Sequence, residues 1–260
     1  MNKTLEDARA RLKENNLDPS LANYLYDCIK EQKGSISEFN NGIEELIKGK
    51  PVQYIIGNVD FYGNIIDVNE NVLIPRFETE RLVELTIEKI KNMPKPIKIL
   101  DIGTGTGCIA ITLKKELDCE IDAIDISSEA LDIAKTNAKK NDVKITFYKS
   151  NILRNVAKQF DVIISNPPYL SEEDEVMDIV KNNEPHIALY AKNKGLYFYE
   201  EILKNCIYNL NSKYLIAFEI GENQKDAITK LANEYLENIK VECYQDYNGK
   251  DRYIFISSIK

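Results

Sequence analysis

The chain has 260 residues, of which 43% are hydrophobic and 29% charged, and its formal net charge at pH 7 is −8. That length suffices for an α/β domain with a small companion domain, while the acidic charge argues against tight binding to duplex nucleic acid, which usually requires a basic face. Because no apolar run approaches the roughly 20 residues of a membrane span and the first residues lack the apolar stretch of a secretion signal, we expect a cytoplasmic protein that does not enter a membrane.

Residues 1–50 have the spacing of three short amphipathic helices, at 4–16, 19–32 and 37–50. Such helices can cover one another's apolar stripes, so we expect a small helical domain. Its charge is mixed rather than basic, which suits a protein partner better than nucleic acid. Residues 51–76 change to a strand-like period broken by turn residues such as Gly63, and this pattern predicts a β-hairpin connector.

Residues 77–260 alternate between helix and strand patterns, starting with a helix from Glu78. Seven strands are predicted at 97–103, 120–126, 144–150, 160–166, 213–220, 239–245 and 251–259. Helices between them imply a parallel, doubly wound α/β sheet. The last two strands are joined by too few residues for a helical crossover and should pair as an antiparallel hairpin. We therefore expect a seven-stranded sheet with its last strand reversed, unlike an ordinary dinucleotide-binding sheet.

A glycine-rich turn follows the first of these strands. Gly103, Gly105 and Gly107 allow a tight turn and the close approach of a ligand to the main chain. Their Gly-x-Gly-x-Gly spacing differs from the Gly-x-Gly-x-x-Gly fingerprint of pyrophosphate binders. Asp125 ends the second strand, where an acid accepts both hydroxyls of a ribose or, alternatively, caps the next helix, a role for which Ser127 is better placed. A ribose-bearing cofactor without a pyrophosphate favours S-adenosyl-L-methionine.

The segment Ser-Asn-Pro-Pro-Tyr-Leu, 165–170, gives strand 160–166 an unusual end. The prolines bias Asn166 and Pro167 toward extended backbone and remove two N–H donors, so the turn cannot wind directly into a helix. It presents the Asn166 side-chain oxygen and the Pro167 carbonyl as acceptors at the carboxyl edge of the sheet, with Tyr169 as a stacking face. Two acceptors aimed at one nitrogen suit an amide or the exocyclic amine of a base.

This arrangement predicts methyl transfer to nitrogen. An amide nitrogen is a poor nucleophile because its lone pair is delocalised into the carbonyl. Hydrogen bonds from both N–H groups to Asn166 and Pro167 would favour a localised lone pair, and holding the reactants in line can supply roughly 7–11 kcal/mol. A non-catalytic binding module is disfavoured, because binding alone does not require two acceptors on one nitrogen.

Few other residues indicate chemistry. The five cysteines are scattered without a Cys-x-x-Cys pair, so we expect reduced thiols and no metal site. The only histidine, His186, fits a structural role in a loop, and no dedicated base is evident.

The chain resembles the release factor glutamine methyltransferase family, the PrmC/HemK type of protein-(glutamine-N5) methyltransferase. The matching segments are 51–63, 72–84, 101–111, 123–131, 165–170, 184–189, 218–224 and 246–252. The Asn-Pro-Pro-Tyr motif alone is shared with enzymes that methylate amines of DNA and RNA, whereas its combination with Leu-Ile-Pro-Arg-Phe-Glu-Thr-Glu is far more specific. Phe77 stands where the family usually has proline, Asn151 where it more often has aspartate, and His186 where arginine is common.

The resemblance implies a Rossmann-like methyltransferase domain over 77–260 and a release-factor-binding helical domain over 1–50. It implies methylation of the glutamine in the Gly-Gly-Gln loop of peptide chain release factors, in translation termination, with S-adenosyl-L-homocysteine as product. Membranes and direct nucleic-acid binding are not expected; the alternative function is methylation of an exocyclic base amine in DNA or RNA.

The resemblance also assigns roles to residues. The cofactor-binding residues would be Gly103, Thr104, Gly105, Thr106, Gly107, Asp125, Asn151, Ile152 and Asn166. Of these, Asn151 and Ile152 would lie near the adenine. The glutamine would be held by Asn166, Pro167, Pro168 and Tyr169, of which Asn166, Pro167 and Tyr169 are the expected catalytic residues. Arg76, Glu78 and Thr79 would shape the cofactor pocket or, alternatively, form a structural junction with a local salt bridge.

Overall fold

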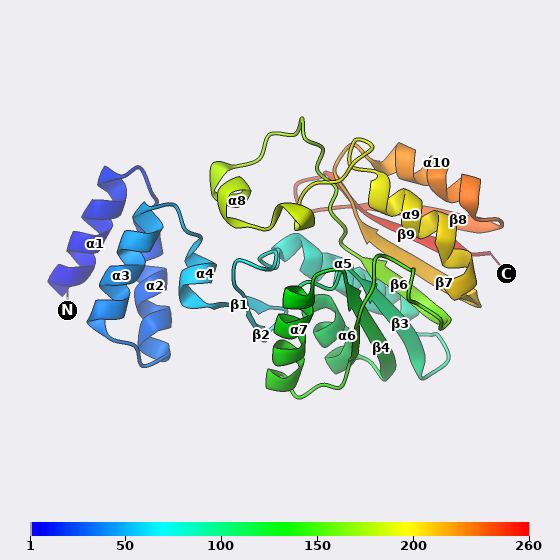
Figure 1. Cartoon of the computed structure of the whole chain (residues 1–260), viewed down its shortest axis with the longest axis horizontal. Coiled ribbons are helices and arrows are strands. Elements are labelled where there is room, and N and C mark those ends of the chain that lie inside the picture. Colours follow the sequence, from blue (N-terminus) through cyan, green and yellow to red (C-terminus); the bar gives the residue numbers. More distant parts are fainter. Residues whose placement is uncertain (1, 260) are drawn as a thin grey trace.

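The computed structural model describes residues 2–259 and contains two arrays of secondary structure joined by a connector (Figure 1). The first array has the three helices that the sequence predicts, α1 (Asn2–Glu14), α2 (Ser20–Glu31) and α3 (Ile36–Ile47). Their buried side chains, including Leu12, Leu25 and Phe39, form a hydrophobic cluster of their own. A capping box between Ser35 and Glu38 starts α3, because each satisfies a backbone N–H of the other. The helical cluster thus lies at one end of the molecule, away from the sheet.

The connector contains the predicted hairpin but begins with a helix. Strands β1 (Asn58–Phe61) and β2 (Asn64–Asp67) pair through Tyr62 and Gly63, both at positive φ, as a tight hairpin turn requires. The strand prediction for residues 51–57 was wrong, because Val52–Ile56 form helix α4. A short apolar run cannot distinguish helix from strand by its period. Here Val52 and Ile56 pack onto the helical cluster, which favours a helical turn that buries both.

The second array is a seven-stranded sheet in the order β5-β4-β3-β6-β7-β9-β8. Its strands are β3 (Ile97–Ile102), β4 (Cys119–Asp125), β5 (Thr146–Lys149), β6 (Phe160–Ser165), β7 (Leu210–Glu219), β8 (Ile239–Gln245) and β9 (Asp251–Ser258). The pairs from β5 to β7 are parallel, whereas β9 is antiparallel to both of its neighbours. The predicted fold, with the last strand reversed, is confirmed.

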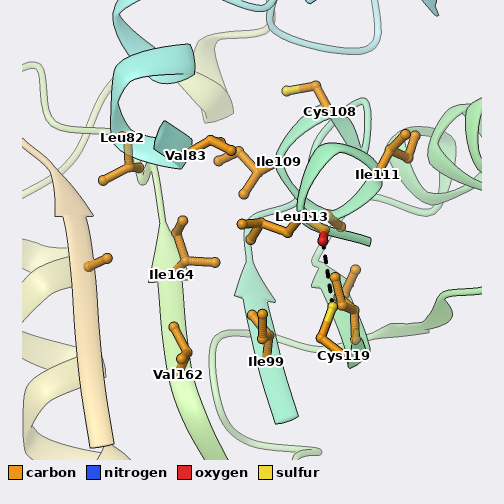
Figure 2. Packing of buried hydrophobic residues seen from close by; sticks show 14 of the residues in the cluster. Leu82, Val83, Ile99, Cys108, Ile109, Ile111, Leu113, Cys119, Val162 and Ile164 are labelled. Carbon is orange, nitrogen blue, oxygen red and sulfur yellow. Dashed lines mark hydrogen bonds between the residues drawn. The ribbon is translucent and has the colours of Figure 1, made fainter. Parts of the chain in front are cut away.

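Helices cover both faces of this sheet. Helices α5 (Phe77–Ile90), α6 (Cys108–Glu116) and α7 (Ser128–Lys140) lie on one face, and α9 (Tyr197–Asn205) and α10 (Lys225–Tyr235) on the other. Figure 2 shows the first face, where Leu82 and Ile109 pack over Val162 and Ile164. Because the central strands are buried on both sides, they read as nearly continuous apolar runs.

The chain makes a long excursion between β6 and α9 that the sequence did not predict. Leu170 and Tyr190 pair in an isolated parallel bridge that closes its base. The outer part contains the helix α8 (Asp178–Asn183) and a 3-10 turn, and Asn183 donates a hydrogen bond to the Gly49 carbonyl beyond α3. The excursion therefore connects the turn after β6 with the helical cluster.

Two features concern the chain as far as the structure describes it. None of the helices within residues 2–259 combines the length and apolarity needed to cross a membrane. The five cysteines are free thiols, three of them buried.

Candidate active site

A cavity of about 520 Å³ opens at the carboxyl ends of β3, β4 and β6. The strand order reverses between β3 and β6, and ligands of open α/β sheets bind at such a switch point. Its volume lies in the usual range for small-molecule sites. The predicted residues that line it are Gly103, Gly105, Asp125, Asn151, Ile152, Asn166, Pro167 and Pro168. Segments far apart in the sequence are thus brought to one site.

The glycine turn forms the floor of the cavity. Gly103 and Gly105 have φ of +71° and +53°, and a Cβ built on either would meet no atom within 4 Å. The backbone of this turn is therefore open to a ligand, as glycine permits. Thr104 and Thr106 are buried and do not line the cavity. Gly107 serves packing instead, because its Cβ position lies 3.2 Å from the Ala134 side chain.

Asp125 stands beside this turn at the end of β4. Its Oδ2 accepts a hydrogen bond from the Gly105 N–H and its Oδ1 one from the Ser127 N–H, both at 2.9 Å. Burial raises the pKa of Asp125, and these backbone N–H groups oppose the rise. Each oxygen keeps a further lone pair, so the carboxylate can also accept two ribose hydroxyls. The Ser127 side chain caps α7, which leaves Asp125 available for a ligand.

Asp101 was not predicted as a site residue, although an acid directly before a glycine turn is a usable signal. Its side chain is fully buried, and its Oδ2 accepts a hydrogen bond from the Thr104 hydroxyl at 2.6 Å. No partner within residues 2–259 reaches its Oδ1. Burial, together with the neighbouring Asp125 charge, raises the pKa of Asp101 to about 7. Asp101 does not line the cavity, and its unpaired oxygen is a buried acceptor next to the glycine turn.

The opposite wall of the cavity is the Asn166-Pro167-Pro168 turn. The Asn166 Nδ2 donates to the Thr79 hydroxyl oxygen at 3.0 Å, and the Thr79 hydroxyl donates to Glu219 Oε2 at 2.7 Å. Within the described residues, no hydrogen bond reaches Asn166 Oδ1 or the Pro167 carbonyl. Both predicted acceptors are therefore available to a ligand.

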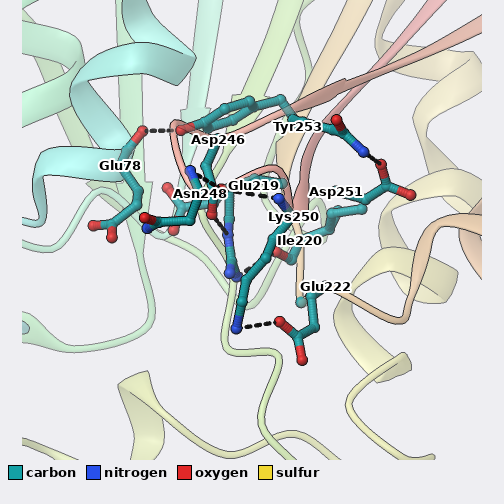
Figure 3. A network of polar contacts seen from close by, with 12 residues as sticks. Glu78, Glu219, Ile220, Glu222, Asp246, Asn248, Lys250, Asp251 and Tyr253 are labelled. Atoms are coloured by element: carbon teal, nitrogen blue, oxygen red, sulfur yellow. Dashed lines mark hydrogen bonds and ion pairs between the residues drawn. The ribbon is translucent and has the colours of Figure 1, made fainter.

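Glu219 lies behind this wall, at the end of β7. Burial raises its pKa to about 7, although the Thr79 hydrogen bond and the Arg252 charge act in the opposite direction. Arg252 is itself fixed by an ion pair with Asp246 at 3.4 Å, and the Tyr253 hydroxyl donates to the Glu78 carbonyl at 2.9 Å. Figure 3 shows how the β8–β9 turn and the start of α5 meet around this region.

Tyr169 does not line the cavity. Its side chain packs against the hydrophobic cluster under α9, and its carbonyl accepts a hydrogen bond from Gln224 at 2.9 Å. A Cβ at Gly195 would lie 2.1 Å from the same carbonyl oxygen, so this stretch is closely packed. The aromatic side chains that do line the cavity are Tyr197 and Phe198, which the sequence did not single out. The stacking role of Tyr169 stays a prediction.

Arg76, Glu78 and Thr79 do not form a local salt bridge. Arg76 pairs at 2.5 Å with Glu184, and Glu184 also accepts a hydrogen bond from the Ile74 N–H. This pair anchors the part of the excursion from which Pro185, Ile187 and Ala188 reach the cavity. His186 is exposed and contacts the Lys181 carbonyl, in keeping with a role in the loop. Within residues 2–259 no three potential metal ligands of the His, Cys, Asp or Glu type come together.

Comparison with known proteins adds to this geometry. Residues 78–185 match the family model described as "Methyltransferase small domain". The chain is 41% identical over 216 residues to the release factor glutamine methyltransferase of Streptococcus pneumoniae R6, covering 82% of this chain and 77% of that protein. The Flavobacterium psychrophilum enzyme of the same description is 44% identical over 216 residues, 80% and 71% of the two chains. A solved methyltransferase from Pyrococcus furiosus shares the fold, with 21% identity, a TM-score of 0.58 and coverage of 76% and 91%.

Proposed function

Because the chain belongs to the release factor glutamine methyltransferase family, we propose that it methylates the side-chain amide nitrogen of the glutamine in the Gly-Gly-Gln loop of peptide chain release factors. It is a methyltransferase, and S-adenosyl-L-methionine is the proposed donor. The observation that carries this proposal is the pair of free acceptors, Asn166 Oδ1 and the Pro167 carbonyl, on the wall of a cavity with an open glycine floor.

The cofactor would be held by residues at the floor and the side of the cavity. Gly103 and Gly105 leave the main chain accessible, and Asp125 would accept the ribose hydroxyls. Asn151 and Ile152 line the cavity and would contact the adenine, with the uncharged Asn151 amide as a hydrogen-bonding partner. When bound, S-adenosyl-L-methionine supplies a methyl group made electrophilic by a positively charged sulfur.

The substrate glutamine would be oriented by the turn after β6. Its two amide hydrogens would be donated to Asn166 Oδ1 and the Pro167 carbonyl. These two hydrogen bonds fix the plane of the amide, so that the nitrogen lone pair, which is perpendicular to that plane, can face the methyl group. The new N–C bond replaces the methyl–sulfur bond of the donor, and one of the two amide hydrogens is released to water as a proton. Pro168 stiffens the turn and keeps these acceptors in place before the substrate binds.

We assign partner recognition to the helices of residues 1–50 and catalysis to residues 77–260, with 51–76 as connector. This division is supported by the separate hydrophobic cluster of the first helices. It is also supported by the Asn183 contact to Gly49, which ties the helical cluster to the loop that follows the reactive turn. We place the enzyme in the cytoplasm, where peptide-chain release occurs.

The test is methyl transfer from labelled S-adenosyl-L-methionine to a purified release factor, with the same factor carrying a Gln→Ala change in its Gly-Gly-Gln loop as the control. We expect label in the first protein and none in the second. Label taken up by DNA or RNA, with the release factor unmodified, would refute the proposal in favour of a base-amine methyltransferase.

A further inference from the structure

Three polar side chains from distant parts of the sequence meet behind the cavity wall. Glu219 ends β7, Thr79 lies in the first turn of α5, and Asn166 directly follows β6. The Thr79 hydroxyl donates to Glu219 at 2.7 Å, and the Thr79 oxygen accepts from the Asn166 Nδ2 at 3.0 Å. Thr79 and Glu219 are only 3% and 2% exposed. Bulk water therefore offers these two groups no alternative partners.

Glu219 sets the direction of both hydrogen bonds. An ionised carboxylate can only accept, so it takes the single hydrogen of the Thr79 hydroxyl. The Thr79 oxygen can then only accept a hydrogen bond from Asn166, so Asn166 must donate one from its NH₂ group. If the amide were flipped, two oxygen acceptors would face each other without a hydrogen between them, which is costly in a buried site.

We propose that Glu219 and Thr79 are positioning residues, which select the amide orientation that turns Asn166 Oδ1 toward the substrate. The inference rests on the proposed function, since it assigns the acceptor on Asn166 to the substrate amide. It adds that the orientation of this acceptor depends on where the protons lie on Thr79 and Glu219, which both interact with the Asn166 NH₂ group. Neither Thr79 nor Glu219 has to touch the substrate to act in this way.

The charge state of Glu219 links this arrangement to pH. The titratable groups that face Glu219 are Glu78 in α5, Cys108 in α6, Tyr169 after β6, Tyr199 in α9, and Arg252 and Tyr253 in β9. Burial raises the pKa of Glu219 to about 7 despite the nearby Arg252 charge. A protonated Glu219 can donate to the Thr79 oxygen. The Thr79 hydrogen is then free to bond the oxygen of a flipped Asn166, and turnover should fall as the pH is lowered through about 7.

Substitutions at Thr79 test the proposal by kinetics. Thr79→Val removes the hydroxyl at nearly constant volume and should lower kcat about tenfold, the effect of one lost hydrogen bond, with KM for S-adenosyl-L-methionine within about twofold. Thr79→Ser keeps the hydroxyl and should restore most of kcat. Thr86→Val is the matched control, because Thr86 is buried in the same helix and its hydroxyl donates to the Leu82 carbonyl. Thermal unfolding of each variant shows whether it is folded.

A second measurement requires no substrate. The Asn166 side-chain NH₂ resonances, observed by ¹H–¹⁵N NMR, should titrate near pH 7 in the wild type, and this titration should vanish in Glu219→Gln and be reduced in Thr79→Val. The positioning role is overturned if folded Thr79→Val keeps the wild-type kcat and the wild-type loss of turnover at low pH. It is also overturned if the Asn166 resonances titrate in the same way in Glu219→Gln as in the wild type. A wild type that fails to label release factors but shows the Asn166 titration contradicts the proposed function alone.

Discussion

Asn166 combines two requirements that few residue types meet. Its NH₂ group donates to Thr79 at 3.0 Å, its oxygen has no partner among residues 2–259, and the residue lines the cavity. Aspartate at this position would have no hydrogen to donate to Thr79, and alanine would remove the acceptor. The amide is therefore matched to its protein neighbour and, in the proposed function, also to an NH₂ group on the substrate.

Replacing Asn166 by alanine should separate catalysis from cofactor binding. We expect kcat to fall by roughly 10²–10³-fold, as for removal of one preorganised polar group in other enzymes. Affinity for S-adenosyl-L-methionine, measured by calorimetry, should stay within about threefold, because Gly103, Gly105 and Asp125 are untouched. Asn233→Ala, an exposed asparagine on α10, serves as the control. Undiminished turnover in Asn166→Ala would remove this residue from the mechanism.

The turn between β3 and α6 shows how one element supplies both a fold and a binding surface. Three glycines adopt positive φ within five residues, and only Gly107 is required by close packing. Gly103 and Gly105 leave open space above the main chain. The first two glycines therefore leave room for the proposed ligand, and the third serves the contact between α6 and α7.

Alanine substitutions distinguish these roles. Gly105→Ala and Gly49→Ala both introduce a side chain at positive φ, at +53° and +90°, where neither Cβ meets a neighbour within 4 Å. Both variants should lose roughly 1–2 kcal/mol of unfolding free energy from backbone strain. Only Gly105→Ala also places a methyl group in the cavity, so it alone should bind S-adenosyl-L-methionine about tenfold or more weakly. Equal cofactor affinities of the two variants, measured by calorimetry, would contradict a cofactor-binding glycine floor.

One ion pair anchors the outer part of the excursion between β6 and α9. The Glu184 side chain is 1% exposed and its partner Arg76 is 34% exposed. Arg76→Ala leaves a buried carboxylate with only the Ile74 N–H, and we expect a loss of roughly 1.5–3 kcal/mol in urea unfolding, with faster proteolysis within residues 171–189. Lys135→Ala, which breaks the exposed pair with Asp132, should cost less than about 1 kcal/mol. An equally small loss for Arg76→Ala would show that the excursion is anchored elsewhere.

The elements predicted from sequence are those whose signal is local. Alternating helices and strands predicted the seven-stranded sheet, and the short link between β8 and β9 predicted the reversed strand. Residues 51–57 were misread because burial against the helical cluster, rather than periodicity, decides their conformation. Helix α8 has no buried residue and so gives no apolar pattern.

The site was predictable in part for the same reason. Asn166 and Pro167 belong to one contiguous motif at a strand end, so their place on the cavity follows from local sequence. The contact of Thr79 with Glu219 joins residues 140 positions apart, and only the folded chain brings them together. Tyr169 shows what local sequence does not predict. The orientation of its side chain is decided by packing against the core and not by its neighbours in the motif.

For the molecule as a whole, two fully buried carboxyl groups, Asp101 and Glu219, sit under the cavity with pKa values raised to about 7. A carboxyl with a raised folded-state pKa contributes stability below its unfolded pKa, and this contribution is lost as the pH rises through the folded pKa. Both groups therefore make the folded chain less stable at neutral than at mildly acidic pH. Buried carboxyl groups with raised pKa values, which lower the free energy of unfolding at neutral pH, are typical of functional sites.

Asp101→Asn tests the predicted pH dependence of stability, because the asparagine side chain does not titrate. Between pH 5 and 8, the unfolding free energy of the wild type should decline relative to that of the variant by on the order of 2–3 kcal/mol. Urea unfolding at intervals of one pH unit, without cofactor, measures the difference. A constant difference over this range would mean that Asp101 is already ionised at pH 5 in the folded protein.

The bridge between Leu170 and Tyr190 gives the chain a closed side loop whose two ends share one anchor. Insertions or deletions beyond that anchor change the length of the loop without pulling on the residues before it. Residues 171–182 can thus vary in length while the turn after β6 stays in place, whereas Glu184 is held by the Arg76 ion pair and Pro185, Ile187 and Ala188 belong to the cavity wall.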